Sequence, residues 1–419
     1  MRIFYTFLLY LLAPLVLLRL AWRGLRAPDY WRRWPERFGS VAPALGKQVI
    51  WIHAVSVGEV QAAEPVVRAL LERYPAYSLL LTTVTPTGSA RVRVLFGNEV
   101  AHVYAPYDLP DAVARFFNRV RPQLAIIMET ELWPNLFHSC QQRAIPLLLL
   151  NARLSERSLA GYRRVRGLVG ETLAAITAIA AQGEADAGRF ESLGANPAII
   201  TVTGNLKFEQ HLPPSLLEQA EALRRDWGVG RPVWIAASTH EGEDEQLLEV
   251  FHQLRKRFGD CLLVLAPRHP ERFGAVAALY RQHGYQTVLR SEHAAYSAST
   301  SVYVADTMGE LPLLYAASDV AFVGGSLVAH GGHNLLEPAA LGIPVVTGPH
   351  VFNFKEICEL LVAAGAAVKV ADREELLHTL SHWLEDANER HRIGQLGCQV
   401  VARNRGALEA VMAIIGRYL

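Results

Sequence analysis

The sequence is poor in cysteine and has no excess of charge of either sign. Its four cysteines stand at positions 140, 261, 358 and 398, far apart and without a C-x-x-C pair. That spacing argues against a structural zinc site and is typical of a protein in a reducing compartment. Lysine and arginine together number 41 and aspartate and glutamate 40, so the formal net charge is +1. The chain as a whole therefore has no field that attracts nucleic acid, and we predict no nucleic-acid partner.

Charge is also absent from residues 3–18, and Arg19 interrupts an apolar run that reaches Trp22. This run is slightly short of the roughly 20 residues needed to span a bilayer, although an arginine at its edge can snorkel to the headgroups. No convincing small-x-small cleavage site follows it, so we predict an uncleaved membrane anchor. The alternative is a hydrophobic first helix packed on the globular body.

The segment after the apolar run is basic and aromatic. Residues 1–40 contain seven arginines against Asp29 and Glu36, a net charge of +5, and this bias places the body of the protein in the cytoplasm. Tryptophan and tyrosine alternate with the arginines, at positions 22, 30, 31 and 34. We predict that residues 1–40 form an anchor and an interfacial segment that faces anionic lipid, whether the helix spans the bilayer or lies in its interface.

Beyond residue 40, short apolar runs alternate with helical patterns, and there is no short-period repeat or low-complexity segment. The runs are 49–54, 79–84, 100–104, 124–128 and 147–150, then 233–237, 261–266, 302–305, 320–323, 344–347 and 367–370. This alternation predicts βαβ units and mainly parallel sheets in an α/β fold. The stretch 205–214 breaks the pattern, so we predict two domains, 41–210 and 211–419. Two doubly wound domains that face each other would bring the carboxyl ends of their strands into a shared cleft.

The stretch 319–350 has the clearest ligand-binding pattern. An apolar run ends in a glycine pair at 324–325, a second pair follows at 331–332, and a helical pattern opens at Asn334, a good N-cap. Backbone N–H groups at a helix N-terminus suit a phosphate, and glycines allow the close approach. Glu337 falls in the first turn, where it can also accept hydrogen bonds from sugar hydroxyls. The pattern predicts a nucleotide-sugar site, and the alternative is an ordinary glycine-rich βα turn.

Polar loops follow five other predicted strands, at 53–59, 128–135, 238–243, 267–272 and 306–311. They contain Glu59, the pair Glu129 and Glu131, Arg268 and Glu310. Each loop alone is consistent with a helix cap on the surface. Five of them at equivalent strand ends indicate a functional site instead.

A series of motifs carries a resemblance to a known family. They are Ser-Val-Gly-Glu at 56–59, Glu-Thr-Glu-Leu-Trp-Pro-Asn at 129–135, Asn-Ala-Arg-Leu-Ser at 151–155, Gly-Asn-Leu-Lys-Phe at 204–208, Pro-Arg-His-Pro-Glu-Arg at 267–272, Asp-Thr-Met-Gly-Glu at 306–310 and Asn-Leu-Leu-Glu-Pro at 334–338. In this order they closely resemble the bacterial 3-deoxy-D-manno-octulosonic acid (Kdo) transferases, which act on lipid A precursors. The resemblance runs essentially from the N-terminal segment to the C-terminus.

The resemblance implies a GT-B glycosyltransferase, with two Rossmann-like domains facing across a cleft and an N-terminal membrane-anchor helix. It implies that domain 41–210 binds the acceptor and domain 211–419 the CMP-sugar donor. The implied reaction moves Kdo from CMP-Kdo to a lipid A precursor, lipid IVA, in lipopolysaccharide core biosynthesis. It would take place on the cytoplasmic side of the bacterial inner membrane, so inner-membrane lipids are further implied partners.

The resemblance also implies residue roles. Glu59 is the general base that takes the proton of the acceptor hydroxyl in a single, inverting displacement. Glu131 and Lys207 stabilise the transition state. The alternatives are purely structural roles: a first-turn helix carboxylate for Glu59, a strand-end cap for Glu131 and a surface lysine for Lys207. The implied CMP contacts are Pro267, Arg268, Met308, Gly309, Glu310, Asn334, Leu335, Leu336 and Glu337; among them Arg268 has the fork for a single phosphate and Glu337 would hold the ribose.

We predict no essential metal and no cofactor beyond the donor substrate. The His-Gly-Gly-His stretch at 330–333 lacks a third ligand at helical spacing, and the chain shows no D-x-D pair to hold a metal on a diphosphate. Two other functions fit parts of the pattern. One is a GT-B transferase or epimerase that uses a UDP-sugar, and the other is a non-catalytic, membrane-anchored glycan-binding protein on the same fold.

Overall fold

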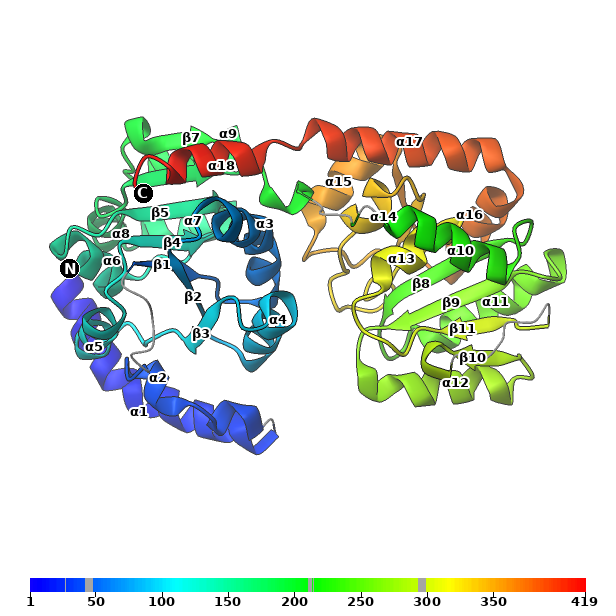
Figure 1. Ribbon diagram of the computed structural model, residues 1–419, viewed down its shortest axis with the longest axis horizontal. Helices are drawn as coiled ribbons and strands as arrows, with labels where there is room; N and C mark the ends of the chain where they lie inside the picture. The colour runs from blue at the N-terminus through cyan, green and yellow to red at the C-terminus, as the bar shows by residue number, and fades with distance from the viewer. Residues whose placement is uncertain (27, 42–47, 210–212, 214, 293–298) are drawn as a thin grey trace. The chain divides into compact units, whose positions relative to one another are not determined.

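A computed structural model of the chain describes residues 1–26, 28–41, 48–209, 213, 215–292 and 299–419 (Figure 1). The chain divides into two units, Met1–Glu209 with Arg405–Leu419, and Gln210–Asn404. The predicted boundary between residues 210 and 211 lies outside the described residues.

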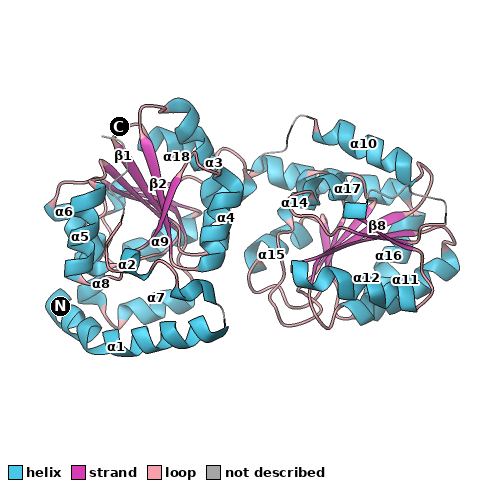
Figure 2. Cartoon of the chain, turned by 60° about the horizontal axis from the view of Figure 1, so that its bottom comes forward, coloured by secondary structure: helices cyan, strands magenta, loops and turns pink. Residues whose placement is uncertain are grey.

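The first unit is built on a parallel sheet with the strand order β3-β2-β1-β4-β5-β6-β7. Strand β1 is apolar on both faces, because Ile50 and Ile52 enter one hydrophobic cluster while Val49 and Trp51 enter the other. Helices therefore cover both faces, as Figure 2 shows. The strands are β1 (Val49–His53), β2 (Ser78–Thr83), β3 (Ala101–Tyr104), β4 (Leu124–Met128), β5 (Leu147–Ala152), β6 (Ala178–Ala181) and β7 (Ile200–Val202).

The order of these strands reverses between β1 and β4, and at such a point the loops after two neighbouring strands diverge and leave room for a ligand. The helices of the first unit begin with α1 (Arg2–Arg26), η1 (Pro28–Trp31) and α2 (Trp34–Arg37). The helices of its α/β part are α3 (Val57–Arg73), α4 (Pro86–Phe96), α5 (Pro110–Val120), α6 (Pro134–Gln142), α7 (Glu156–Arg163), α8 (Arg166–Leu173), α9 (Glu184–Ser192), η2 (Pro197–Ile199), η3 (Leu206–Phe208) and α18 (Ala407–Ile415).

The second unit repeats this plan, with the parallel order β10-β11-β9-β8-β12-β13-β14. Its switch point lies between β8 and β12. The strands are β8 (Val233–Thr239), β9 (Leu262–Pro267), β10 (Thr287–Leu289), β11 (Val302–Val304), β12 (Val320–Val323), β13 (Val345–Thr347) and β14 (Ala367–Lys369). The helices are α10 (Leu216–Trp227), α11 (Asp244–Arg257), η4 (Pro270–Arg272), α12 (Phe273–Gln282), η5 (Arg290–Glu292), α13 (Leu311–Ala316), α14 (Leu336–Ala340), α15 (Lys355–Ala363), α16 (Arg373–Glu385) and α17 (Ala387–Arg403).

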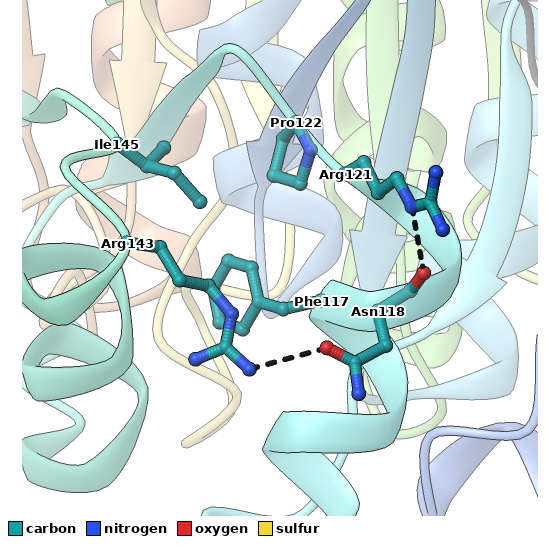
Figure 3. Close-up of a pocket in the computed structure, with 6 residues that line it drawn as sticks. All are labelled: Phe117, Asn118, Arg121, Pro122, Arg143 and Ile145. Atoms are coloured by element: carbon teal, nitrogen blue, oxygen red, sulfur yellow. Dashed lines mark hydrogen bonds between the residues drawn. The ribbon is translucent and has the colours of Figure 1, made fainter.

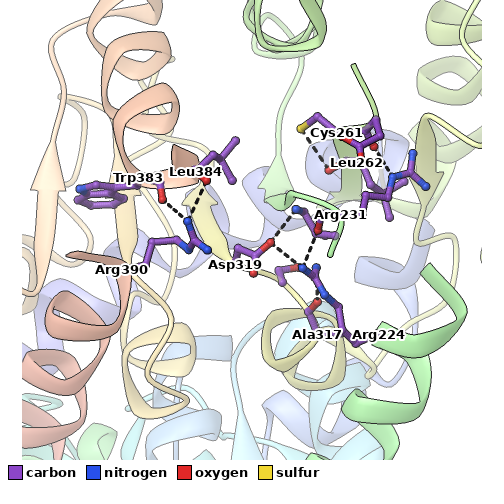
Figure 4. A network of polar contacts seen from close by, with 12 residues as sticks. Arg224, Arg231, Cys261, Leu262, Ala317, Asp319, Trp383, Leu384 and Arg390 are labelled. Carbon is purple, nitrogen blue, oxygen red and sulfur yellow. Dashed lines mark hydrogen bonds and ion pairs between the residues drawn. The ribbon is translucent and has the colours of Figure 1, made fainter. Parts of the chain in front are cut away.

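A polar network fastens the amino ends of the two central strands of the second sheet (Figure 4). The Asp319 carboxylate accepts hydrogen bonds from the N–H of Val233 and from the guanidinium of Arg224, both at 2.8 Å. Arg224 also donates to the carbonyl oxygen of Arg231 at 2.6 Å. These contacts tie α10 to the starts of β8 and β12, at the edge of the sheet away from the ligand loops.

The two parallel Rossmann-like sheets confirm the predicted fold, and every predicted apolar run corresponds to a strand. Strands β6, β7 and β10 were not predicted. A second difference concerns the C-terminus, because helix α18 packs on the first unit whereas we had included it in domain 211–419. Its residues Ala407, Val411 and Ile415 are buried in the same hydrophobic cluster as β1 and α3. An apolar helical pattern predicts a buried face, but it does not predict which core receives that face.

Candidate active site

Glu59 lies at the switch point of the first sheet, in the first turn of α3 after β1. The hydroxyl of Ser56 caps this helix by accepting the N–H of Glu59 at 3.3 Å. In return the Glu59 carboxylate accepts the Ser56 hydroxyl at 2.9 Å and the N–H of Val55 at 2.8 Å. This reciprocal arrangement has the form of a capping box, so Glu59 orders the helix start as well as facing the loop region.

The protonation state of Glu59 is unusual. Its side chain is buried, with 8% exposure, and burial raises the pKa of its carboxyl to about 7. The negative charges of Glu129 and Glu131 raise the pKa further, while the hydrogen bond from Val55 opposes the rise. A carboxyl that titrates near neutral pH is suited to accept and release a proton during a reaction.

Glu129 and Lys207 form an ion pair beside this carboxyl. The Lys207 Nζ lies 2.8 Å from Glu129 Oε1, and both side chains are largely covered. Glu129 directly follows β4 and has a φ of 55°, in the left-handed region that costs a non-glycine residue of order 1–3 kcal/mol. Glu129 stands in one of the family motifs, for which the resemblance implies no role at this position. Glu129 pairs with the predicted catalytic lysine, and its charge acts on both other carboxylates.

Glu131 completes the acidic group of the first unit. The indole N–H of Trp133 donates to Glu131 Oε2 at 2.8 Å. Burial raises the pKa of Glu131, and the charge of Glu129 adds to the rise. The structure therefore brings together all three side chains predicted to be catalytic, namely Glu59, Glu131 and Lys207, and adds Glu129.

A buried asparagine positions the turn that carries Lys207. Asn151 is fully buried near the end of β5, and its Oδ1 accepts the N–H of Leu206 at 2.9 Å. Its φ of 53° is again left-handed. Asn205 caps the same turn by accepting the N–H of Lys207 at 3.0 Å. Asn151 stands in one of the family motifs, but we predicted no role for it. An amide side chain within an otherwise apolar strand is the signal that could have indicated its role.

His53, at the end of β1, is buried against Trp133, the residue that donates to Glu131. Its Nδ1 lies 2.8 Å from the hydroxyl of Thr82, and its ring meets that of Trp133 edge to face with centroids 5.0 Å apart. Burial lowers the pKa of His53 to about 4, so the ring is neutral at physiological pH. It contributes shape and no charge.

In the second unit, the predicted CMP-contacting residues lie at the end of β9 and after β9, β11 and β12, at the carboxyl edge of the sheet. Pro267 is buried, Arg268 is partly exposed, and Met308 is 62% exposed. Glu310 is held by two hydrogen bonds from Arg290, at 2.8 and 3.2 Å, and by the hydroxyl of Thr307. Its carboxylate therefore organises the loop of Met308 and Gly309.

Residues 334–337 form the other part of this predicted site. Asn334 accepts the N–H of Leu336 through Oδ1 and donates from Nδ2 to Glu337 Oε1, both at 3.0 Å. Leu335 and Leu336 are buried. Helix α14 begins at Leu336, one residue later than an N-cap at Asn334 predicts, and Asn334 caps the turn that precedes it.

The first glycine pair has a role that we did not predict. The carboxylate of the fully buried Glu243 accepts the N–H groups of Gly325, Ser326 and Leu327 at 2.7–3.0 Å. It also accepts the N–H of His240 at 2.9 Å. The backbone N–H groups of 325–327 therefore donate to a carboxylate of the protein and not to a phosphate. A Cβ at Gly324 would lie 2.9 Å from the Glu243 Oε2, which explains a glycine there.

Four histidines gather beside this loop. The Nε2 atoms of His240 and His333 are 2.8 Å apart. The His330 ring stacks on the His240 ring with centroids 4.2 Å apart, and the His269 ring contacts the His240 ring edge to face. Burial lowers the pKa of His240 to about 4 and that of His333 to about 3, and neighbouring histidines and arginines reinforce both shifts. Within the described ranges, no group of three or more His, Cys, Asp or Glu side chains is arranged to hold a metal ion.

An open pocket of about 320 Å³ lies elsewhere in the first unit (Figure 3). It is lined by the C-terminal ends of α5 and α6 and by residues that precede β4 and β5, with Arg121 and Arg143 on its walls. This is the amino edge of the sheet, opposite to Glu59. The pocket contains none of the predicted site residues.

Comparisons with known proteins match the chain along its length to one family. Residues 32–210 match the family model of 3-deoxy-D-manno-octulosonic-acid transferase (kdotransferase), and residues 236–399 match glycosyl transferases group 1. The chain is 44% identical to a 3-deoxy-D-manno-octulosonic acid transferase of Haemophilus influenzae, over 100% of this chain and 99% of that one. It is 37% identical to the transferase of the same name from Bordetella pertussis, over 99% of each chain.

Solved structures agree on the fold. A UDP-GlcNAc 2-epimerase from Neisseria meningitidis superimposes with a TM-score of 0.58, covering 88% of this chain and 100% of that one. Its sequence is 13% identical, so the likeness concerns the two-domain fold and not the reaction.

Proposed function

The chain belongs to the 3-deoxy-D-manno-octulosonic acid (Kdo) transferase family, and from this premise we propose that it transfers Kdo from CMP-Kdo to the lipid A precursor lipid IVA. It is a GT-B glycosyltransferase of lipopolysaccharide biosynthesis. We further propose that the reaction takes place at the cytoplasmic side of the inner membrane. The observation that supports the mechanism most is the buried Glu59 carboxyl, with its pKa of about 7, at the switch point of the first sheet.

Glu59 is the proposed general base. Its ionised carboxylate takes the proton of an acceptor hydroxyl while the hydroxyl oxygen forms a bond to the anomeric carbon of Kdo. The bond between that carbon and the phosphate oxygen breaks in the same step, and CMP leaves with the electron pair. Attack opposite to the leaving group inverts the anomeric centre. The hydrogen bonds from Val55 and Ser56 hold the carboxylate in one orientation throughout.

Glu131 and Lys207 are proposed to stabilise charge in the transition state. Positive charge develops at the anomeric carbon as the leaving group departs, and the Glu131 carboxylate favours it. Lys207 neutralises the Kdo carboxylate or the departing phosphate. Because Lys207 is paired with Glu129 at 2.8 Å, its ammonium is already oriented before a substrate anion arrives.

The donor nucleotide is proposed to bind the second unit. Arg268 donates to the phosphate through its fork, and Glu337, oriented by Asn334, accepts hydrogen bonds from the ribose hydroxyls. The loop of Met308 and Gly309, held by the Arg290 to Glu310 pair, presents its backbone to the base. The further proposed contacts are Pro267, Leu335 and Leu336. These groups bind a single phosphate without a metal, and we propose that no metal ion is essential.

The alternatives from the sequence have less support. A UDP-sugar transferase or epimerase shares the fold, but the sequence identity of 13% to such an epimerase supports nothing beyond the fold. A non-catalytic glycan-binding protein is excluded by the assignment to a family of transferases.

The test is a transfer assay with the full chain in detergent, CMP-Kdo as donor and tetra-acylated lipid IVA as acceptor, with mass analysis of the lipid. We expect the wild type to add Kdo, CMP to inhibit more strongly than UDP, and Glu59→Gln to lower kcat by about 10²-fold or more. Glu72→Gln, an exposed carboxylate on the same helix, is the matched control and should retain full activity. An unchanged rate in Glu59→Gln would exclude the base, and absence of product in the wild type would exclude the donor or the acceptor.

A further inference from the structure

Helix α1 is long and apolar enough to cross a bilayer, from Arg2 to Leu25, yet in the structure it lies along the first unit (Figures 1 and 2). Covered positions recur every three or four residues from one end of the helix to the other, among them Tyr5, Leu9, Ala13, Leu17, Leu20 and Gly24. This spacing is one stripe of a helix. One stripe of α1 is therefore covered along the helix, and η1 packs against its C-terminal half.

Polar contacts fix the first half of α1. The hydroxyl of Tyr5 donates to Asp108 Oδ2 at 3.0 Å, and that of Tyr10 donates to Asp111 at 2.6 Å. Thr6 donates to Asn135 at 3.0 Å. Asp108 is itself buried and accepts the N–H groups of Asn135 and Leu136 at the start of α6. Tyr5 therefore completes a site that belongs to the fold of the first unit.

The opposite face of α1 is apolar and uncovered. Ile3 is 83% exposed, Phe7 65% and Leu18 66%, and further leucines and phenylalanines extend the same surface. Monomeric soluble proteins rarely expose a continuous apolar face of this size, so it indicates a membrane partner. Exposed Arg19, Arg23 and Trp22 follow at its C-terminal end, and this composition matches anionic headgroups.

A helix that crosses the bilayer would have to leave this docking site. The contacts of Tyr5, Thr6 and Tyr10 would break, and Arg2 and the N-terminal ammonium would have to pass through the hydrocarbon to the far side of the membrane. Little would be gained, because the docked stripe of Leu9, Leu17 and Leu20 is already partly covered. Immersion of the exposed face alone keeps both the docking contacts and the apolar burial.

We propose that α1 lies in the plane of the membrane, with its exposed face sunk into one leaflet and its first half docked at the starts of α5 and α6. The partner is the surface of an anionic phospholipid leaflet. The first unit is then held against that leaflet along a whole helix, and the chain does not cross the bilayer. This inference is independent of the transfer reaction, and its tests do not use activity.

The first test measures depth. Full-length protein in vesicles of phosphatidylethanolamine and phosphatidylglycerol carries an environment-sensitive fluorophore on Phe4→Cys, Leu11→Cys or Leu18→Cys, in a Cys398→Ser background that removes the exposed native thiol. Quenching by lipids that carry spin labels at known depths reports the position of each label. Phe4 and Leu18 are about 21 Å apart along a helix. We expect the three labels at one shallow depth; a Leu11 label near the bilayer centre, with Phe4 and Leu18 towards opposite surfaces, would overturn the proposal.

The second test asks whether α1 stays docked on the membrane. Thr6→Cys with Asn135→Cys should form a disulfide in membranes, and the cross-linked protein should float with the vesicles as the wild type does. A disulfide that forms in detergent but not in membranes, or a cross-linked protein that leaves the vesicles, would contradict docking in the plane. The depth labels replace exposed side chains, so they report even if the Asn135 variant folds poorly.

Discussion

The carboxyl of Glu59 sits among acidic neighbours, and this arrangement predicts a pH profile. As the proposed base it must be ionised, so kcat/KM should fall about tenfold for each pH unit below its pKa of about 7. Glu129→Gln removes one neighbouring negative charge, which lowers the pKa of Glu59 and moves the acid limb to lower pH. The measurement is kcat/KM from pH 5 to 9.

Glu72→Gln, distant from the site, should leave the acid limb in place. An acid limb that stays fixed in Glu129→Gln, or moves to higher pH, would contradict the electrostatic coupling of the two carboxylates.

Two substitutions of Asn151 distinguish its effect on backbone strain from its effect on the position of Lys207. Both Asn151→Gly and Asn151→Ala lose the acceptor of the Leu206 N–H, so the Lys207 turn loosens and kcat should fall in both. The left-handed φ of 53° suits glycine and strains alanine, by about 1 kcal/mol, so the alanine variant should melt at a lower temperature. Thermal unfolding and steady-state kinetics together check this. Equal melting temperatures, or a normal kcat in Asn151→Gly, would show that the residue does not act in this way.

The sequence predicted the residues of the first site better than their partners. The resemblance to the transferase family implies the roles of Glu59, Glu131 and Lys207, and the structure brings these three side chains together. That Lys207 pairs with Glu129 could not be predicted, because the pairing depends on how β4 and η3 lie in space and on a left-handed φ at Glu129. A side chain's type is local information, whereas its partner is set by tertiary structure.

The loop after β12 depends on one buried carboxylate from another element. Glu243 precedes α11 and accepts N–H groups from 325–327. Glu243→Ala would leave buried donors unpaired, each at about 1–3 kcal/mol, so we expect a large loss of stability. Glu243→Gln retains an acceptor and should lose less, while the KM for CMP-Kdo rises because the loop precedes the Asn334 turn.

The matched control for this loop is Glu241→Ala, two residues away and exposed, which should behave as the wild type. Calorimetry gives the stability and initial rates give the KM. A Glu243→Ala protein as stable as Glu241→Ala would exclude the role of this carboxylate.

Most strands could be predicted because they are buried on both faces and so form continuous apolar runs. Strand β1, with Val49, Ile50, Trp51 and Ile52 all buried, is such a run. Strand β7 and strand β10 are three residues long, lie at the edges of their sheets and are only partly buried, so their sequences carry no clear run. Strand β6 consists of Ala178–Ala181, and short alanine-rich stretches are also typical of helices.

The two units are the same kind of structure built twice along one chain, but the chain does not divide into two consecutive halves. Helix α18 follows the second unit in sequence and belongs to the first in space. Its start is held there by Glu209, whose carboxylate accepts the N–H of Gly406 at 2.7 Å. The sequence predicted both folds because alternation is local. It did not predict the return of the chain, because α18 is apolar enough to suit either core.

This return makes the stability of the first unit depend on the last residues of the chain. Val411, Met412, Ile414 and Ile415 are buried in its core, and burial of each such side chain contributes about 1.5–3 kcal/mol. Their sum is comparable to the net stability of a whole domain, about 5–15 kcal/mol.

A fragment of residues 1–209 in detergent should therefore aggregate. The same fragment joined to 405–419 by a short Gly-Ser linker should fold, because Glu209 and Gly406 are already in contact; Val411→Asp in the joined fragment should abolish this rescue. Size-exclusion chromatography and thermal unfolding decide: a monomeric 1–209 fragment that melts at the same temperature as the joined one would mean that α18 is an appendage, and that the first unit is complete without it.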